Sequence, residues 1–485
     1  MFRRLSKKRH LFINDTHIET GRSGDFYGCH NLRRVMHQPV KHGIVVKPDQ
    51  KCESPVLQAL SSNVIFEPET GLFRMWYHSF IRQWYAPLNM EVESCYVLYA
   101  ESKDGVNWVK PDLKLFPING EKSNICLMAD GCGVMWPGVI RDLDEKDPER
   151  RYKLLGHGTV DKDHGIVVYF SPDGIHWKAY PHNPVMYARI DCGDSHTLMA
   201  TRDTRTGRFV AGVRPVDWYL SYPDIPYYRY NRGNVQDDVK GTSFSHRRIG
   251  LSFSDDFTHW TPTREVLQAD LDDPPGTQIQ GMSLCAYEEV YLGFLIMYYA
   301  DGINDTIDIQ LAVSDDLEKW QRVGERTPFL PIGSEGEWES QMIFSVANTP
   351  IRVGDELYLY YNTHKTTHYA RHEDRYGAIG LAKIRLDGFV SMYSQGDGFL
   401  VTKPFEWDGE TLRVNADSSA GEMRVQITDE CLRPIEGMTS LPLKEDSVDH
   451  LVQWPGGVAL ADLRGRPVRL KFLMRDTHLY SFSID

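Results

Sequence analysis

Acidic residues recur in this 485-residue chain at one kind of position, directly before or at the start of an apolar run. They are Glu53, Asp191, Asp194, Asp272, Asp273, Glu337 and Glu339. Where carboxyl groups converge, their mutual repulsion raises the pKa of one and keeps it protonated near neutral pH. Such a set can supply a general acid together with a base or nucleophile. Any single acid here could equally be a turn residue, but the recurrence favours a shared site.

A repeat organises the elements that would position these acids. The motif Ser-x-Asp-x-x-x-Trp occurs four times, beginning at Ser102, Ser171, Ser254 and Ser314. An apolar, β-branched or aromatic run precedes each copy, and a second such run lies further upstream. The pattern predicts a unit of antiparallel strands closed by a turn. We expect the Asp side chain to cap this turn and the Trp to pack between neighbouring sheets.

A fifth, degenerate unit follows, with strands predicted at residues 341–345, 356–361 and 379–384. The sequence therefore predicts an all-β protein in which residues 51–392 form a five-bladed β-propeller. Residues 1–50 are expected to pack on the ring or to complete it. Residues 393–485 alternate apolar and polar positions and predict a C-terminal β-sandwich with an accessory role.

The turn motif, recurring around a five-unit ring, resembles that of the five-bladed glycoside hydrolases of families 32, 43, 68 and 130. The resemblance covers about two thirds of the chain and is closest to a divergent family 32-like branch. The sequence also departs from those enzymes. The sequence contains Arg141-Asp142-Leu143 but no Arg-Asp-Pro motif, and its Glu-Cys pair, Glu430-Cys431, lies in the predicted C-terminal domain rather than in the propeller.

The resemblance implies a glycoside hydrolase, or a transglycosylase, with three carboxylates at the axial mouth of the propeller. Cleavage requires protonation of the leaving oxygen and activation of a nucleophile on the opposite face of the sugar. We assign Glu339 as the general acid, Glu53 and Asp194 as base or nucleophile and charge stabiliser, and Asp273 as a reserve. An exo-acting enzyme on a furanoside or fructoside is expected.

Further residues are candidates for substrate binding at the same mouth. Polar residues that follow the second strand of each unit could hold sugar hydroxyls, and tryptophans could stack on a sugar face. The candidates are His78, Trp84, Trp136, His157, His196, Arg214, Trp218, Gln280, Asp301, Asn362 and His364. Among them, Arg214 could bind the carboxylate or sulfate of an acidic sugar, although a surface ion pair is the plainer interpretation.

Composition excludes other classes of function. A formal net charge of −13 disfavours binding to nucleic acid. No apolar run approaches the length of a membrane span, and no signal sequence is visible, so a cytoplasmic location is expected. The eight cysteines are dispersed, which predicts free thiols. No histidine or cysteine spacing is diagnostic of a metal, so no metal and no cofactor are predicted. A homo-oligomer is compatible with the sequence.

Two alternatives stay open. A sugar-binding propeller without activity would keep the aromatic residues but would not need converging carboxylates. A glycoside phosphorylase would need a cluster of cationic side chains at the mouth to bind phosphate, and Arg214 alone is thin support for one.

Overall fold

The computed structural model describes residues 2–23, 26–54, 57–58, 63–85, 90–118, 120–129, 133–160, 163–187, 197–203, 205–219, 244–300, 305–347, 349–368, 376–457 and 459–485. This part of the chain is all-β and contains no α-helix, which confirms the prediction of an all-β protein. It holds four short 3-10 helices: η2 (Pro148–Arg150), η4 (Gly324–Arg326), η6 (Pro455–Gly457) and η7 (Leu460–Leu463). Within the described ranges, no helix has the length and apolar character needed to cross a membrane.

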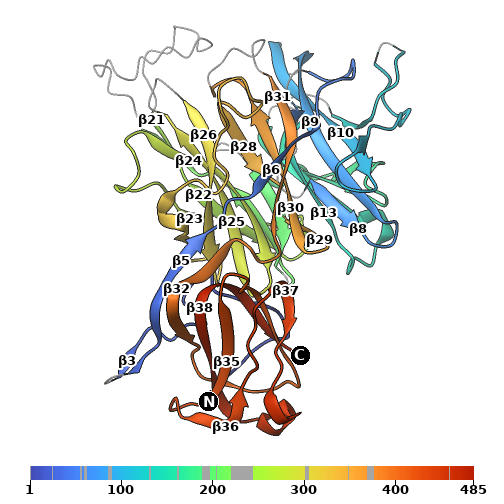
Figure 1. Ribbon diagram of the computed structural model, residues 1–485. Coiled ribbons are helices and arrows are strands. Elements are labelled where there is room, and N and C mark those ends of the chain that lie inside the picture. Colours follow the sequence, from blue (N-terminus) through green and yellow to red (C-terminus); the bar gives the residue numbers. More distant parts are fainter. Residues whose placement is uncertain are drawn as a thin grey trace.

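Three antiparallel sheets follow one another along the first half of the chain (Figure 1). The first is a six-stranded sheet of β7 (Leu57–Gln58), β8 (Val64–Glu67), β9 (Leu72–Tyr85), β10 (Met90–Ser102), β11 (Trp108–Val109) and β12 (Ile125–Met128). The second has five strands, β13 (Val134–Arg141), β14 (Tyr152–Val160), β15 (Asp163–Ser171), β16 (Lys178–Ala179) and β17 (Met186–Tyr187). The third has four, β18 (Thr197–Arg202), β19 (Phe209–Val213), β22 (Ile249–Ser254) and β23 (Arg264–Leu267). A separate hairpin pairs β20 (Val216–Tyr219) with β21 (Phe244–Arg247).

A nine-stranded sheet follows and consists of two antiparallel groups. One group comprises β24 (Thr277–Tyr287), β25 (Val290–Tyr299), β26 (Thr306–Ser314) and β27 (Gln321–Arg322). The other comprises β28 (Met342–Val346), β29 (Ile351–Val353), β30 (Glu356–His364), β31 (Gly377–Arg385) and β6 (Val40–Val46). A single parallel pair, Ile307 with Met342, joins the groups. Because β6 belongs to the N-terminal segment, the last group is completed by residues from the beginning of the chain.

Apolar cores connect these sheets in a closed succession. Trp76 and Tyr99 of the first sheet pack with Leu154 of the second. Residues of the second and third sheets share another core, and the third packs with both groups of the nine-stranded sheet. The last group returns to the first sheet, where Tyr360 packs in one core with Phe73. Burial on both faces explains why the strands are rich in apolar and β-branched residues.

The four Ser-x-Asp-x-x-x-Trp copies form the predicted turns. In the copy at Ser171, the Asp173 carboxylate accepts hydrogen bonds from the backbone N–H groups of Ile175 and His176, each at 2.8 Å. The same pattern holds in the other three copies. Trp108 packs between sheets as predicted, since its ring meets that of Tyr360 of the nine-stranded sheet edge-on, with the centroids 5.6 Å apart.

The C-terminal part forms a ten-stranded sheet system that also takes strands from the N-terminus (Figure 1). Its strands are β1 (Arg3–Arg4), β2 (His10–Leu11), β5 (Cys29–Met36), β32 (Val390–Val401), β33 (Phe405–Glu406), β34 (Leu412–Asp417), β35 (Glu422–Asp429), β36 (Pro434–Thr439), β37 (Asp446–Leu451) and β38 (Pro467–Ile484). A small hairpin pairs β3 (Arg22–Ser23) with β4 (Phe26–Tyr27). The N-terminal segment thus supplies strands to two sheets, while the predicted domain boundaries stay predictions. The six cysteines in the described part form no disulfide.

Candidate active site

A pocket of about 440 Å³ lies at the seam between the two groups of the nine-stranded sheet. Its wall is made by residues from the ends of strands and from the loops that enter them. They are Pro274, Pro275, Tyr299, Thr306, Ile332, Ser340 and Gln341. Tyr299 ends β25, Thr306 begins β26, and Gln341 directly precedes β28. The pocket therefore opens where strand entries from both groups meet, which is the kind of position that the acidic residues of the sequence predict.

A buried carboxyl group lies beside this pocket. Asp308 is 8% exposed and occupies β26 two residues after Thr306, so both side chains share one face of the strand. The hydroxyl of Tyr299 donates a hydrogen bond to Asp308 Oδ1 at 3.1 Å. Burial raises the pKa of Asp308 to about 7, although the Tyr299 hydrogen bond and the Arg322 charge act in the opposite direction. A carboxyl group with this pKa is protonated in about half of the molecules at neutral pH.

A chain of hydrogen bonds holds Tyr299 and connects the predicted residue Asp273 to it. Gln310 Nε2 donates to the Tyr299 hydroxyl at 3.3 Å, and Gln310 Oε1 accepts from Arg322 Nη2 at 2.6 Å. Arg322 Nη1 in turn donates to Asp273 Oδ2 at 2.7 Å. Although burial acts the other way, the arginine contacts lower the pKa of Asp273 below its usual value. Asp273 thus orients the arginine rather than lining the pocket.

Glu339, the predicted general acid, adjoins the pocket wall at Ser340. Its side chain is 11% exposed, and Lys41 Nζ lies 3.4 Å from Glu339 Oε1. Burial, reinforced by the charges of Glu339 and Glu337, raises the pKa of Tyr361 well above its usual value. Glu337 is exposed and accepts a hydrogen bond at 2.7 Å from the backbone N–H of Ser334 in its own loop. Of the two acids of this loop, Glu339 is therefore the buried one, and it directly precedes the pocket residue Ser340.

An aromatic pair flanks the same loop. The rings of Trp338 and Tyr376 stack with their centroids 5.0 Å apart, and Lys365 Nζ lies 4.7 Å from the Trp338 ring centroid. Tyr376 is 41% exposed and Trp338 is half-buried, so part of this surface faces solvent. Amphipathic aromatic rings offer an apolar face together with a polar edge. The pair could contact one face of a sugar ring near the pocket.

Glu53, the first predicted acid, lies in a closed network. Its carboxylate has no exposed surface and accepts a hydrogen bond from the Tyr77 hydroxyl at 2.8 Å. Lys110 Nζ lies 2.7 Å from Glu53 Oε1, and the backbone N–H groups of Asp49 and Gln50 donate to Oε2 at 2.9 Å. With every oxygen occupied, this carboxylate is arranged as a buried structural ion pair that orders residues 49–53.

Several of the predicted binding residues lie together in the interior. Arg214 Nη1 reaches the Gln280 carbonyl oxygen at 3.5 Å, and Gln280 Nε2 lies 3.5 Å from His368 Nε2. Phe344 packs between the His368 and His364 rings, at 6.2 and 5.8 Å. Burial, together with the nearby His364, lowers the pKa of His78 to about 3. His78 is therefore neutral at physiological pH.

Two further candidates are also buried. Trp136 is 8% exposed and stacks on His157, with the ring centroids 6.1 Å apart. Asn362 is fully buried and donates to the Ser345 hydroxyl at 2.6 Å. Neither Trp136 nor Asn362 lines the pocket at the strand seam.

The remaining candidates fall outside the described residues. These are Asp191, Asp194, His196 and Asp301. Trp84 lies in β9 and Trp218 in β20, but the structure describes only the backbone of these two residues. For these six residues the site assignment stays a prediction.

The sequence does not predict three residues of the candidate site, Asp308, Trp338 and Tyr376. Asp308 was overlooked because it lies inside a strand rather than before one, yet Thr306, Asp308 and Gln310 alternate with apolar residues and could have indicated a polar face. Trp338 and Tyr376 meet only through the fold. No local pattern connects two residues that are so far apart in the sequence.

Comparison with known proteins gives matches in structure only. No protein-family model and no curated protein sequence matches the chain. A structure of a BT0996–RGII complex is 14% identical with a TM-score of 0.48, over 72% of this chain and 93% of the other. An N-acetylgalactosamine deacetylase from F. plautii is 13% identical with a TM-score of 0.46, over 74% of this chain and 97% of the other. A family 32 β-fructofuranosidase from Bombyx mori is 11% identical with a TM-score of 0.41, over 93% of both chains.

Glycoside hydrolases of families 43 and 32 are thus among the structures found, as the motif resemblance suggested. A shared fold does not fix an activity.

Proposed function

We propose that the protein is a carbohydrate-active enzyme that hydrolyses glycosidic bonds at the pocket of the strand seam. In this proposal the three separate sheets and the two groups of the nine-stranded sheet are five blades of a propeller. The closed succession of apolar cores supports this interpretation. The ten-stranded C-terminal system is then an accessory β-sandwich.

The observation that carries the proposal is the buried carboxyl group of Asp308, which is hydrogen-bonded to the pocket residue Tyr299. A glycosidase needs one carboxylic acid that keeps its proton near neutral pH and a second carboxylate that stays anionic. The environment of Asp308 meets the first requirement. Glu339, which faces the Lys41 ammonium group, is suited to the second. The sequence-based role of general acid therefore passes from Glu339 to Asp308, and Glu339 becomes the base or nucleophile.

The volume of the pocket supports a small substrate. A volume of about 440 Å³ is at the small end of ligand sites. It suits a terminal sugar rather than the middle of a long polymer, which supports an exo-acting enzyme. Trp338 and Tyr376 would contact the face of the next sugar. A furanoside or fructoside remains the first substrate class to test, and Asp194 remains the proposed third carboxylate.

A sugar-binding propeller without activity is the second candidate function. It would be favoured by the aromatic pair alone, but it gives no reason to bury a carboxyl group at the cost of stability. A phosphorylase would bind phosphate with cations at the pocket. Arg322 is nearby but is engaged with Gln310 and Asp273, so its donors are directed away from a phosphate ligand.

The proposal is tested with a panel of aryl glycosides that includes β-fructofuranosides and α-arabinofuranosides, with and without phosphate. We expect phosphate-independent release of the aryl group for one class. Asp308→Asn and Glu339→Gln should each lower turnover by about 10²–10⁴-fold. The matched control is Glu337→Gln in the same loop, which should stay within a few-fold of the parent. Sugar binding without turnover would favour the lectin, and release only with phosphate would favour the phosphorylase.

A further inference from the structure

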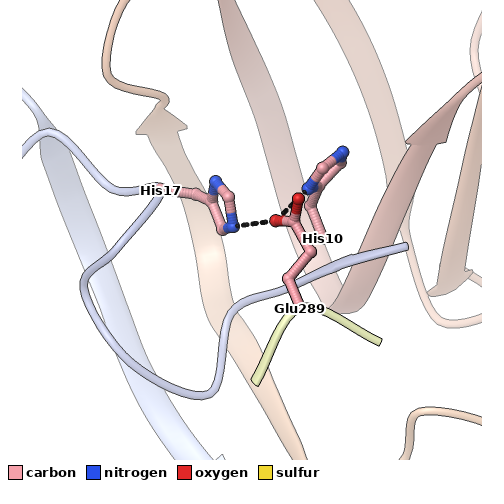
Figure 2. A group of neighbouring side chains, drawn as sticks. All are labelled: His10, His17 and Glu289. Atoms are coloured by element: carbon pink, nitrogen blue, oxygen red, sulfur yellow. Dashed lines mark hydrogen bonds and ion pairs between the residues drawn. The ribbon is translucent and has the colours of Figure 1, made fainter. Parts of the chain in front are cut away.

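Two histidines and a glutamate from distant parts of the chain meet at the junction of the N-terminal segment, the C-terminal sheet and the β24–β25 turn (Figure 2). His10 begins β2, which pairs with β38, and His17 follows in the same N-terminal segment. Glu289 lies at the tip of the turn, between Tyr287 and Val290. His10 is fully buried, His17 is 6% exposed, and the Glu289 side chain is 11% exposed.

The three side chains direct their ligand atoms to one point. His10 Nδ1 lies 2.6 Å and His17 Nε2 lies 3.0 Å from the same oxygen, Glu289 Oε2. All three ligand atoms lie within 4.8 Å of one another. Two ligands of a tetrahedral Zn²⁺ ion are about 3.3 Å apart, given bond lengths of about 2.0–2.1 Å. With an ion bound, the two nitrogen–oxygen distances would lengthen by about 0.3–0.7 Å.

Both ring nitrogens of His10 face hydrogen-bond acceptors, and Nδ1 faces Glu289 Oε2. Its Nε2 lies 3.2 Å from the Ser6 carbonyl oxygen, which can only accept, so Nε2 carries a hydrogen. In the neutral ring, Nδ1 is then a lone pair directed at a carboxylate oxygen. Either a second proton or a metal cation has to lie between them. A ligating histidine that donates its other N–H to a backbone carbonyl is the usual arrangement around bound metals.

The Glu289 carboxylate is also held by a hydrogen bond from outside the cluster. The Ser6 hydroxyl donates to Glu289 Oε1 at 2.6 Å, which leaves Oε2 for the histidines. Arg3 Nη2 lies 3.5 Å from Oε2, but this side chain is half-exposed and at the edge of the cluster. Glu288, the other turn residue, has φ of 50° and accepts from the Arg9 backbone N–H at 3.1 Å. The turn is thus tied to residues 6–10 at several points.

We propose that His10, His17 and Glu289 bind one Zn²⁺ ion that fastens the N-terminal segment and the C-terminal sheet to the β24–β25 turn. Two imidazoles and one carboxylate are ligands that suit zinc and disfavour calcium or magnesium. Three protein ligands leave the fourth tetrahedral position for a water molecule. Glu289 precedes β25 at the end opposite the pocket residue Tyr299, so in this proposal the ion acts on the packing of the sheets rather than on the pocket.

The test measures metal content and zinc affinity of the full-length protein. After treatment with a chelator and titration with Zn²⁺, the wild type should bind one equivalent per chain. His10→Ala, His17→Ala and Glu289→Gln should weaken binding by about 100-fold or more, and Ser6→Ala by about 10–100-fold because it removes only a supporting contact. Co²⁺ should replace zinc and give the visible absorption bands of a tetrahedral site.

The matched control is His176→Ala. His176 Nδ1 also lies 2.6 Å from a carboxylate oxygen, that of Asp173, but both side chains are largely exposed and their contacts with other described residues include no second histidine. This variant should keep its zinc. Ser6→Ala is a mild substitution, so it gives an answer even where a ligand variant fails to fold. The proposal is overturned if the folded wild type binds no zinc, since the cluster is then an imidazolium–carboxylate pair. It is equally overturned if the ligand variants retain zinc.

Discussion

At the scale of single residues, Asp308 is unusual because its burial works against stability. In the unfolded chain its carboxyl group has an ordinary pKa of 3.8, and in the folded protein the pKa is about 7. Between these values the folded state binds more protons than the unfolded state, so the free energy of unfolding falls as the pH rises. Above pH 7 the full penalty of a buried anion applies. A residue kept at such a cost is a candidate for function.

Replacing Asp308 with asparagine should therefore change stability in a pH-dependent way. The asparagine side chain would keep an oxygen for the Tyr299 hydroxyl but would carry no charge at any pH. At pH 5 the variant should already gain about 1–2 kcal/mol, because the carboxyl group is ionised in the unfolded chain, and at pH 8 the gain should be larger by about 2–3 kcal/mol. Thermal unfolding at both pH values measures the difference. An equal shift at pH 5 and pH 8 would contradict the raised pKa.

Tyr299→Phe tests the same carboxyl group through activity. The Tyr299 hydroxyl stabilises the anionic form of Asp308, so its removal should raise the Asp308 pKa further, by about one unit. Because a general acid must be protonated, kcat/KM falls as the pH rises through this pKa. The alkaline limb of the pH profile should therefore move to higher pH in the variant.

Tyr298→Phe is the control for this shift. The Tyr298 hydroxyl donates to Asp305 Oδ1 at 3.1 Å rather than to Asp308. The alkaline limb of the pH profile of Tyr298→Phe should coincide with that of the wild type. A limb that moves to lower pH in Tyr299→Phe, or not at all, would remove Asp308 from the role of acid.

At the scale of elements, the turn motif shows which parts of the fold are local. The Ser and Asp side chains bond to backbone groups within three residues, so the turn could be predicted from a short stretch of sequence. The backbone carbonyl of the residue after the motif Asp also accepts a hydrogen bond from a neighbouring sheet. Trp76 Nε1 donates to the Gly174 carbonyl at 2.6 Å, and the Tyr360 hydroxyl donates to that of Gly105 at 2.7 Å. Neighbouring sheets are connected through these turns.

Gly174→Ala should therefore lower the stability of the fold by more than the backbone strain alone. Gly174 has φ of 77°, and a Cβ atom there would lie 2.6 Å from the Trp76 ring. The left-handed conformation alone costs about 1–2 kcal/mol, and displacement of the fully buried Trp76 adds to it. Gly354→Ala, with φ of 62° and no atom within 4 Å of the added Cβ, is the matched control. We expect a clearly larger drop in the thermal midpoint for Gly174→Ala, and equal drops would show that the Trp76 contact adds nothing.

The candidate site could be predicted from the sequence only in part, because it depends on contacts between distant residues. The position of acids before strands directed attention to Glu339, beside Ser340 of the pocket wall. It also selected Glu53 and Asp273, whose partners Lys110 and Arg322 lie about 50 residues further along the chain. The pocket itself depends on the single parallel pair between Ile307 and Met342. Contacts between residues so far apart in the chain leave no local sequence pattern. The repeat units could therefore be predicted from the sequence, but the seam between the two groups of the nine-stranded sheet could not.

At the scale of the whole molecule, the beginning of the chain is shared between two sheet systems. β5 pairs with β32 in the C-terminal system, while β6, only a few residues later, completes the nine-stranded sheet. Asp387 lies at the junction with no exposed side-chain surface. It accepts from the Tyr287 and Ser481 hydroxyls, each at 2.6 Å, and Arg9 Nε lies 2.9 Å away. One carboxylate therefore joins the N-terminal segment, the β24–β25 turn and β38.

Asp387→Asn isolates the contribution of this charge to the assembly of the sheets. Asparagine tolerates the φ of 58° at this position, so backbone strain should not obscure the result. The half-buried Arg9 would keep Glu288 as its ion-pair partner, at 2.8 Å, and two hydroxyls would lose a charged acceptor. Hydrogen bonds to charged groups contribute about 1.5–3 kcal/mol each, so we expect a loss of several degrees in the thermal midpoint. Asp255→Asn, which removes the exposed partner of Arg208, is the control and should change the midpoint little. If both variants melt alike, the junction is held by its apolar contacts, and the C-terminal system should then stay docked without the Asp387 charge.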